Sequence, residues 1–348
     1  MRWHAEADGG GIQVIAYGST NEGEAAQNWR RSPFFRMRED GSSQMRCRIG
    51  EGFPTDFPLI ADLKNEGMTD VLVLINRFAK HGVIGEMDCV YSYWVTNRAD
   101  RFRDQEINAL VGLMPKLALS IKCLALGRIA QTLVETYLGR DPGRRVLDGR
   151  IGRGAAEQIS AVLWYSDLRG FTRITDDAPP AQTIGLLNDY AEAVISAIHD
   201  HGGDVLKLIG DGVLAIFPYE GDPEAACSGA IAAERALRKG LAKLNEKRAA
   251  TGKPVTEVYL GLHIGEVFYG NIGSRERLDF TVIGPAVNEV ARIAAMCRSA
   301  ERDVLLSAPF AEAIAAAGSG APVSVGRYAL RGVARPQELF TLDRQPGG

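Results

Sequence analysis

The chain has 348 residues, which is long enough for two domains that each bury a core of their own. Its 46% hydrophobic and 24% charged residues are typical of a globular protein, and its net charge of -3 argues against a dedicated nucleic-acid binder, which carries a basic excess. The five cysteines are scattered without a CxxC pair, which argues against a disulfide scaffold or a zinc site.

The N-terminal residues lack the apolar core of a signal peptide. The most apolar stretch, residues 109–130, contains Pro115 and is interrupted by Lys116, Lys122 and Arg128. It therefore falls short of the roughly 20 uninterrupted apolar residues that a spanning helix needs. We expect a cytoplasmic protein without a transmembrane segment.

The first part of the chain carries two strand-type runs followed by a helical pattern. Residues 70–78 are apolar, and residues 88–96 are rich in aromatic and β-branched side chains, so both runs predict strands. From residue 104, acidic residues and then apolar residues at helical spacing up to Leu124 predict a helix. Pro115 should kink or split it.

Residues 126–157 are predicted to couple this part to the next. A helix should lead to Gly139, the sequence RDPGRR at 140–145 should break it, and the glycine-rich residues 147–154 should form a flexible link. The chain is thus expected to consist of a first domain at 1–125, a helical linker at 126–157 and a second domain at 158–348.

The second domain alternates strand and helix patterns. Helices are expected after Pro180, at about 223–248 and at 286–297. Strands are expected at 161–164, 207–217 (with a turn), 255–268, 278–283, 303–307, 325–330 and 338–342. This order predicts an α+β fold with a mostly antiparallel sheet and helices on one face.

Two aspartates at strand ends are the strongest chemical signal. Asp167 follows the strand at 161–164, and Asp211 lies at the tip of the strand–turn–strand segment 207–217. Either aspartate alone is typical of a turn. Two carboxylates on adjacent strand ends, beside glycines that allow close backbone approach, suit a pair of hard cations on a triphosphate.

The segments YSDLRGFT at 165–172 and KLIGDGV at 207–213 resemble the metal-binding elements of class III nucleotide cyclases, the adenylate and guanylate cyclase family. The resemblance covers roughly residues 158 to 343. It implies a ferredoxin-like catalytic domain with two Mg²⁺ or Mn²⁺ ions per site, held by Asp167, Asp211 and the backbone carbonyl of Leu168. No histidine base is then required, because a metal ion lowers the pKa of the ribose 3′-hydroxyl.

A second motif, IGPAVNEVAR at 283–292, places Asn288 and Arg292 four residues apart and therefore on one helix face. Such a pair in isolation is an ordinary solvated face. The resemblance implies that Asn288 orients the ribose and Arg292 stabilises the transition-state phosphate. It also implies that both reach in from a second protomer, so that a homodimer would hold two shared active sites.

The resemblance also suggests which nucleotide is bound. Lys207 matches the adenine-contacting lysine of adenylate cyclases, and Thr281 stands where an aspartate is usual, as in a threonine-bearing bacterial subgroup. ATP is therefore the expected substrate, with weaker discrimination against GTP because a hydroxyl lacks the carboxylate's charge. Arg275 and Arg331 are candidates for gripping the β- and γ-phosphates, or else ordinary surface arginines.

Ahead of the catalytic domain, the strand–strand–helix order resembles a GAF-type sensor domain. That resemblance implies a small-molecule regulator, and a dimerisation domain that binds nothing is the open alternative. For the second domain, the alternatives to an adenylate cyclase are a guanylate cyclase and a catalytically silent nucleotide-binding module. Retention of both aspartates and of the Asn288–Arg292 pair argues against the silent module.

Overall fold

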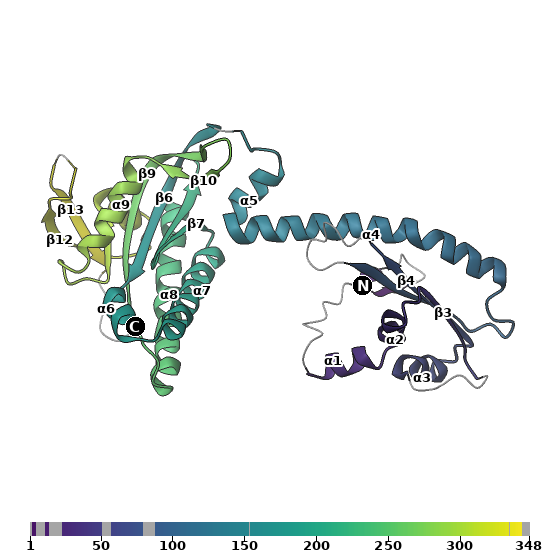
Figure 1. Cartoon of the computed structure of the whole chain (residues 1–348). Helices are drawn as coiled ribbons and strands as arrows, with labels where there is room; N and C mark the ends of the chain where they lie inside the picture. The colour runs from purple at the N-terminus through teal and green to yellow at the C-terminus, as the bar shows by residue number, and fades with distance from the viewer. Residues whose placement is uncertain are drawn as a thin grey trace. The chain divides into compact units, whose positions relative to one another are not determined.

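The computed structural model divides into two compact units, Met1–Ala130 and Gln131–Gly348 (Figure 1). It describes residues 2–4, 11–13, 23–50, 57–78, 88–152, 154–333 and 335–342. The elements of the first unit are β1 (Arg2–His4), β2 (Gly11–Gln13), α1 (Gly23–Arg30), α2 (Pro33–Glu39), β3 (Gln44–Arg48), α3 (Pro58–Asn65), β4 (Asp70–Arg77), β5 (Cys89–Thr96) and the start of α4 (Asp104–Leu138).

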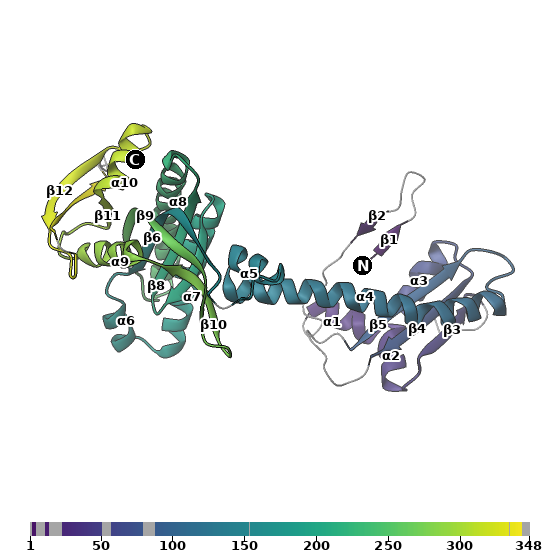
Figure 2. The ribbon, with the colours of Figure 1, turned by 90° about the horizontal axis from the view of Figure 1, so that it is seen from above.

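The first unit is built on an antiparallel sheet in the order β3-β4-β5. Because side chains alternate along a strand, β4 divides two small cores. Val71 and Val73 pack with residues of α2 and α3 on one face, whereas Leu72 and Leu74 pack with Met114 of α4 on the other. Figure 2 shows α4 passing over this sheet. β4 and β5 confirm the two strands predicted at 70–78 and 88–96.

The helix α4 continues through Pro115, so the expected split there is wrong. Met114 and Ala118 are both buried, and this packing on either side of the proline holds the two turns in one helix. Among the described residues, α4 is also the one helix whose length and composition would allow it to cross a membrane. Only 11% of its most apolar window is buried inside the structure. A single helix of this kind is weak support for a membrane span.

The linker helix is interrupted at Gly139, as expected, but residues 140–145 are not the non-helical segment that the sequence predicted, because Arg140–Leu147 forms the separate helix α5. Gly139 does end α4, as predicted, and its φ of 93° is one that glycine adopts readily. Pro142 lies in the first turn of α5, where a missing N–H breaks no intrahelical hydrogen bond.

The second unit contains a mixed sheet in the order β12-β13-β11-β9-β6-β8-β7, and β10 pairs with the far half of β9. Its elements are β6 (Ala156–Leu168), α6 (Phe171–Asp177), α7 (Pro180–Asp200), β7 (Asp204–Ile209), β8 (Gly212–Tyr219), α8 (Glu224–Ala250), β9 (Val258–Gly273), β10 (Leu278–Ile283), α9 (Pro285–Met296), β11 (Val304–Ser307), α10 (Ala308–Ala316), β12 (Pro322–Tyr328) and β13 (Gln337–Leu342). The described strand pairs are antiparallel except β9–β11, which confirms the predicted α+β sheet.

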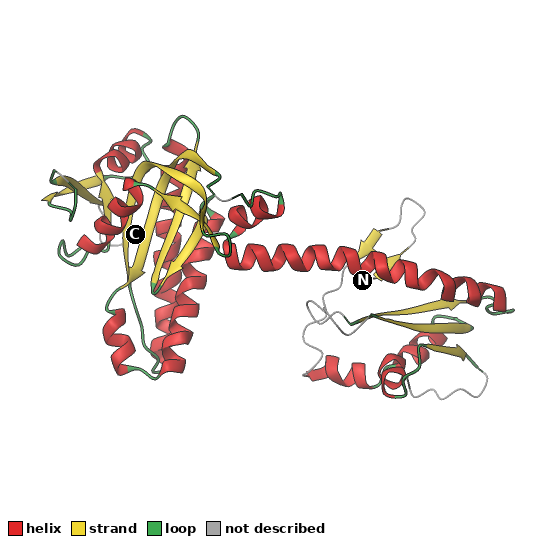
Figure 3. Cartoon of the chain, turned by 45° about the horizontal axis from the view of Figure 1, so that its top comes forward, coloured by secondary structure: helices red, strands yellow, loops and turns green. Residues whose placement is uncertain are grey.

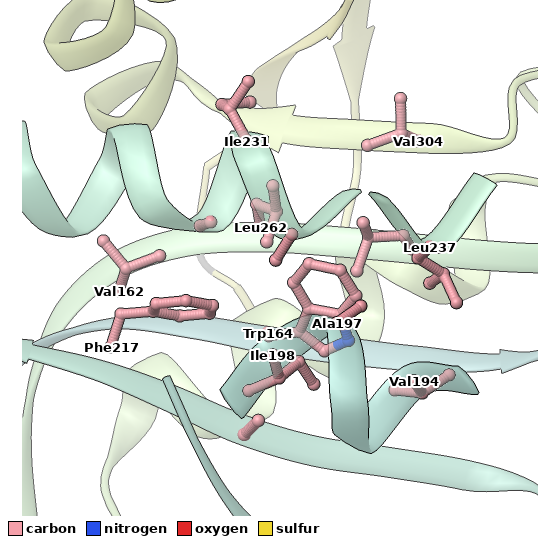
Figure 4. Packing of buried hydrophobic residues seen from close by; sticks show 14 of the residues in the cluster. Val162, Trp164, Val194, Ala197, Ile198, Phe217, Ile231, Leu237, Leu262 and Val304 are labelled. Atoms are coloured by element: carbon pink, nitrogen blue, oxygen red, sulfur yellow. The ribbon is translucent and has the colours of Figure 1, made fainter. Parts of the chain in front are cut away.

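Helices cover both faces of this sheet, which corrects the prediction of a single covered face (Figure 3). Val162 and Trp164 of β6 pack with residues of α7 and α8, and Figure 4 shows Trp164 beside Ala197 and Ile198 in this core. Ala161 and Leu163 point the other way and pack with Val290 of α9. Local periodicity predicts that a helix is amphipathic, but not which face of the sheet it covers.

Candidate active site

The end of β6 is fixed by a buried polar anchor. Ser166 is fully buried and accepts hydrogen bonds from the Trp164 indole N–H (3.1 Å) and from the Tyr190 hydroxyl of α7 (3.2 Å). Because a buried polar group needs a partner, this arrangement holds the strand in one register against α7. Asp167, the next residue, is therefore held at a defined point near the end of β6, where it still pairs with Tyr259 of β9.

Asp167 and Asp211 lie together at the ends of neighbouring strands. Asp211 lies in the tight turn between β7 and β8, where Gly210 adopts a φ of 64°. One carboxylate oxygen of Asp211 accepts the backbone N–H of Leu168 over 3.3 Å. The turn is thereby tied to the end of β6, and the two carboxylates predicted from the sequence to meet are brought together.

The electrostatics of Asp167 fit a cation. Burial and the nearby Asp211 charge raise the pKa of Asp167 to about 6, opposed by Arg298. Its Oδ1 atom is buried without a hydrogen-bond partner among the described residues. A partly buried carboxylate with a second carboxylate beside it is stabilised when a cation binds. Carboxylate oxygens are hard ligands, which suit Mg²⁺. Two carboxylates, together with the Leu168 carbonyl, form a partial ligand set that a nucleotide's phosphates could complete.

Asn288 and Arg292 line an open cleft at the N-terminal half of α9. Its volume is about 560 Å³, and its walls include Gly284, Glu289 and Gly332. Asn288 is exposed, whereas Arg292 is half-buried beside Gly332, so that Arg292 can be held in place while Asn288 stays available. The predicted helix face is therefore present, and it opens onto a cavity.

Lys207 forms an ion pair with Asp279, which the sequence reasoning missed. Lys207 belongs to β7 and Asp279 to β10, where Thr281 lies two residues further along. Side chains two apart on a strand share a face, so Asp279 and Thr281 face the same way. Alternation along β10 indicates that Asp279 shares the face of Thr281, but the contact between β7 and β10 that brings Asp279 to Lys207 is a tertiary feature.

The two predicted phosphate-gripping arginines lie on exposed loops. Arg275 is in the turn between β9 and β10, where the Ser274 hydroxyl accepts two backbone N–H groups, and Arg331 follows β12. Among the residues that the structure describes, no hydrogen bond or ion pair joins either arginine, Asn288 or Arg292 to the aspartates. The candidate residues thus form separate groups within one chain.

The model of the adenylate and guanylate cyclase catalytic domain matches residues 155–342, more than half of the chain. The chain belongs to this family. The match spans β6 through β13 and thus includes every candidate residue named above. The family resemblance read from the aspartate and Asn–Arg motifs is confirmed at this level, for a family whose description names both adenylate and guanylate cyclases.

Relatives and solved structures agree with the cyclase assignment. An adenylate cyclase of Anabaena cylindrica is 33% identical over 154 residues, which cover 44% of this chain and 30% of that protein. An uncharacterised protein of Mycobacterium tuberculosis is 32% identical over 229 residues, covering 64% and 40% respectively. The adenylyl cyclase CyaB from P. aeruginosa is 25% identical with a TM-score of 0.50, and the alignment covers 55% of this chain and 96% of that structure. The matched region therefore spans less than half the length of the Anabaena and Mycobacterium relatives.

Proposed function

We propose that this protein is an adenylate cyclase that converts ATP to 3′,5′-cyclic AMP and pyrophosphate at composite sites of a homodimer. The observation that carries the proposal is the paired Asp167 and Asp211, tied together through the Leu168 N–H, within a cyclase-family domain. The Asp167 Oδ1 atom has no hydrogen-bond partner among the described residues, and a carboxylate so placed beside a second carboxylate is costly unless a cation binds.

Asp167, Asp211 and the Leu168 carbonyl would hold two Mg²⁺ or Mn²⁺ ions. Bound there, the ions would supply Lewis acidity at the ribose 3′-hydroxyl and neutralise charge on the triphosphate. In the reaction, the O3′–Pα bond forms, the bond between Pα and the β-phosphate oxygen breaks, the proton of the 3′-hydroxyl passes to solvent, and pyrophosphate leaves. No histidine is assigned to this proton.

The chain's own side chains would position the reacting groups. Asn288 would hydrogen-bond the ribose so that its 3′-oxygen faces the α-phosphate, and Arg292 would donate to the α-phosphate oxygens as their charge grows. Arg275 and Arg331 are proposed to hold the β- and γ-phosphates. Both are exposed, so their guanidinium groups are accessible for hydrogen bonds to phosphate oxygens.

Base choice is assigned to Lys207 and Thr281. At positions 6 and 1 of the purine, adenine presents an amino donor and then a ring-nitrogen acceptor, whereas guanine presents a carbonyl acceptor and then an N–H donor. The order is reversed, so a site whose acceptor faces position 6 and whose donor faces position 1 selects adenine. A lysine donor beside a hydroxyl acceptor matches adenine. We therefore place ATP ahead of GTP, with a guanylate cyclase as the alternative and a catalytically silent nucleotide-binding module as the weaker one.

The separation of the candidate residues supports the homodimer. Asp167 and Asp211 form one group and Asn288 and Arg292 another, and no described interaction joins them within the chain. A two-fold dimer would bring the first group of one protomer to the second group of its partner, giving two equivalent sites. We further propose a cytoplasmic protein whose first unit is a GAF-like regulatory or dimerisation domain that takes a small-molecule regulator.

The test is product formation by the purified full chain with Mg²⁺ or Mn²⁺, offered ATP and GTP in separate reactions. Cyclic AMP from ATP, lost in Asp211→Ala, would support the proposal. Cyclic GMP as the main product would select the guanylate cyclase, and nucleotide binding without either product would select the silent module.

A further inference from the structure

The ammonium of Lys207 is held by a carboxylate that no cyclase motif used above includes. Asp279 of β10 forms an ion pair with Lys207 of β7, across 72 residues of sequence. The two strands contact each other directly, and both are visible at the same edge of the second unit in Figure 1. We propose that Asp279 is a positioning residue that orients Lys207 for the adenine base and thereby sets the preference for ATP over GTP. This inference rests on the proposed function.

The face of β10 supports this role. Phe280 and Val282 are buried in the sheet's second core, so Asp279 and Thr281 share the opposite face. Lys207 reaches this same face, because its ammonium contacts Asp279. One face of a short strand thus carries the carboxylate that contacts Lys207 and, two residues further on, a hydroxyl, as expected of a small polar site that reads a base edge.

The charge balance of the group indicates what Asp279 contributes. Thr281 is neutral, so it cannot fix the ammonium as a carboxylate in its place would. A lysine side chain has four flexible bonds and a spherical charge, and a free ammonium would donate to guanine's carbonyl as readily as to an adenine ring nitrogen. When one N–H group of Lys207 is bound to Asp279, the ammonium is fixed in position, and its remaining N–H groups can point in fewer directions.

The pair contributes little to the fold itself. The Lys207 and Asp279 side chains are 43% and 50% exposed, so water screens their attraction. Neither is enclosed by the cores of the unit. A substitution at Asp279 should therefore leave the folded state intact, which makes an effect on nucleotide choice interpretable.

The experiment uses the full chain with Asp279→Asn, which keeps the side chain's shape and removes its charge. Glu276→Gln is the matched control, because Glu276 is an exposed carboxylate on the adjoining β9–β10 turn. Asp279→Glu tests rescue by a conserved charge. Steady-state kcat and KM are measured with ATP and GTP separately, and binding of 3′-deoxy-ATP and 3′-deoxy-GTP, which cannot cyclise, is measured by calorimetry with Mn²⁺.

The expected result for Asp279→Asn is a fall of about tenfold in the ATP-to-GTP ratio of kcat/KM, carried mainly by a raised KM for ATP. Glu276→Gln should keep the wild-type ratio, and Asp279→Glu should restore most of it. An unchanged ratio in Asp279→Asn, or an equal change in Glu276→Gln, would overturn the inference.

The binding arm separates this inference from the proposed function. If the wild type forms no cyclic product, the proposed function fails, and the ratio of the two deoxynucleotide affinities still decides the role of Asp279. A ratio that falls in Asp279→Asn supports the inference, and an unchanged ratio overturns it. A wild type that binds neither deoxynucleotide overturns both proposals.

Discussion

The backbone N–H of Leu168 donates to a carboxylate oxygen of Asp211 over 3.3 Å, which joins the end of β6 to the turn between β7 and β8. Asp211 thus has a structural contact in addition to its proposed metal-binding role. The two roles can be separated, because an amide oxygen can still accept the Leu168 N–H but carries no charge.

Asp211→Asn should lower cyclase activity about 100-fold or more while changing the melting temperature little, because the hydrogen bond survives and the negative charge does not. Asp211→Ala should lose the hydrogen bond as well and should melt earlier. Activity and thermal melting of the two variants are compared with Glu220→Gln, an exposed carboxylate just after β8. Near-wild-type turnover by Asp211→Asn would contradict a metal-binding role.

Asp167→Asn should stabilise the metal-free chain at pH 7.5. Burial and Asp211 raise the pKa of Asp167 to about 6, above its unfolded value near 4, so the ionised carboxylate destabilises the folded state. The stabilising effect of protonation is complete below pH about 4 and is lost as the pH rises through about 6. Because the Asp167 carboxyl is only partly buried and water screens its charge, removing that charge should recover about 1–2 kcal/mol at neutral pH, measured by denaturant unfolding without divalent cations.

The same variant should also lose its response to cations. Mn²⁺ with 3′-deoxy-ATP should raise the melting temperature of the wild type, since ligands that bind only the folded state stabilise it, and should have little effect on Asp167→Asn. A metal-free variant that is less stable than the wild type, or one that keeps the full Mn²⁺ shift, would argue against a cation site at Asp167.

A second buried carboxylate should make stability depend on pH away from the active site. Burial raises the pKa of Asp204 to about 6, while one of its oxygens accepts the Asp141 N–H (3.2 Å) at the start of α5. His199 lies 3.8 Å away, and burial lowers its pKa, so it is neutral at pH 7.5 and does not compensate the charge. Asp204→Asn should be more stable than the wild type by about 2 kcal/mol at pH 7.5.

The advantage of Asp204→Asn should shrink as the pH falls through about 6, where the wild-type carboxyl becomes protonated in the folded state, and should vanish below about pH 4. The measurement is the difference in unfolding free energy between the two proteins from pH 4.5 to 8. A difference that stays constant over this range would show that Asp204 does not titrate as its burial implies.

The helices α4 and α5 pack closely at Gly143, which leaves no room for a larger side chain. A methyl group at Gly143 would lie 2.9 Å from the Glu135 backbone, so Gly143→Ala should destabilise the chain by about 1–3 kcal/mol. Gly240→Ala on α8 is the matched control, because its Cβ would meet nothing within 4 Å. The control should gain up to about 1 kcal/mol from helix propensity, measured by denaturant unfolding. Equal effects in the two variants would refute the tight contact.

Local patterns predicted most of the second unit. The strand that carries Asp167 near its end, the hairpin that carries Asp211 and the helix that carries Asn288 all form where sequence periodicity and glycines place them, although the strand is longer than the predicted 161–164. These features depend on neighbouring residues alone. The family resemblance added the order of the motifs, which is why the catalytic domain could be assigned without a structure.

The features that were wrong or missed depend on contacts between distant residues. Met114 packs on the first sheet just before Pro115, and α4 continues through the proline. The face that α9 covers is likewise set by distant residues, because Val290 packs with Ala161 and Leu163 of β6. Asp279 escaped notice because the acidic partner of Lys207 was sought at Thr281, and only the pairing of β10 with β9 brings Asp279 to the lysine.

The most direct test of the shared active site is subunit mixing. Asp167→Ala and Asn288→Ala chains are each expected to be inactive, but a heterodimer would hold one site with both groups intact. An equal mixture after exchange should recover about a quarter of wild-type activity, since half the dimers are mixed and each has one intact site. A mixture of Asp167→Ala with Asp211→Ala should recover none, because both changes affect the same group. A first mixture that stays as inactive as its components, with exchange verified, would contradict the composite-site cyclase.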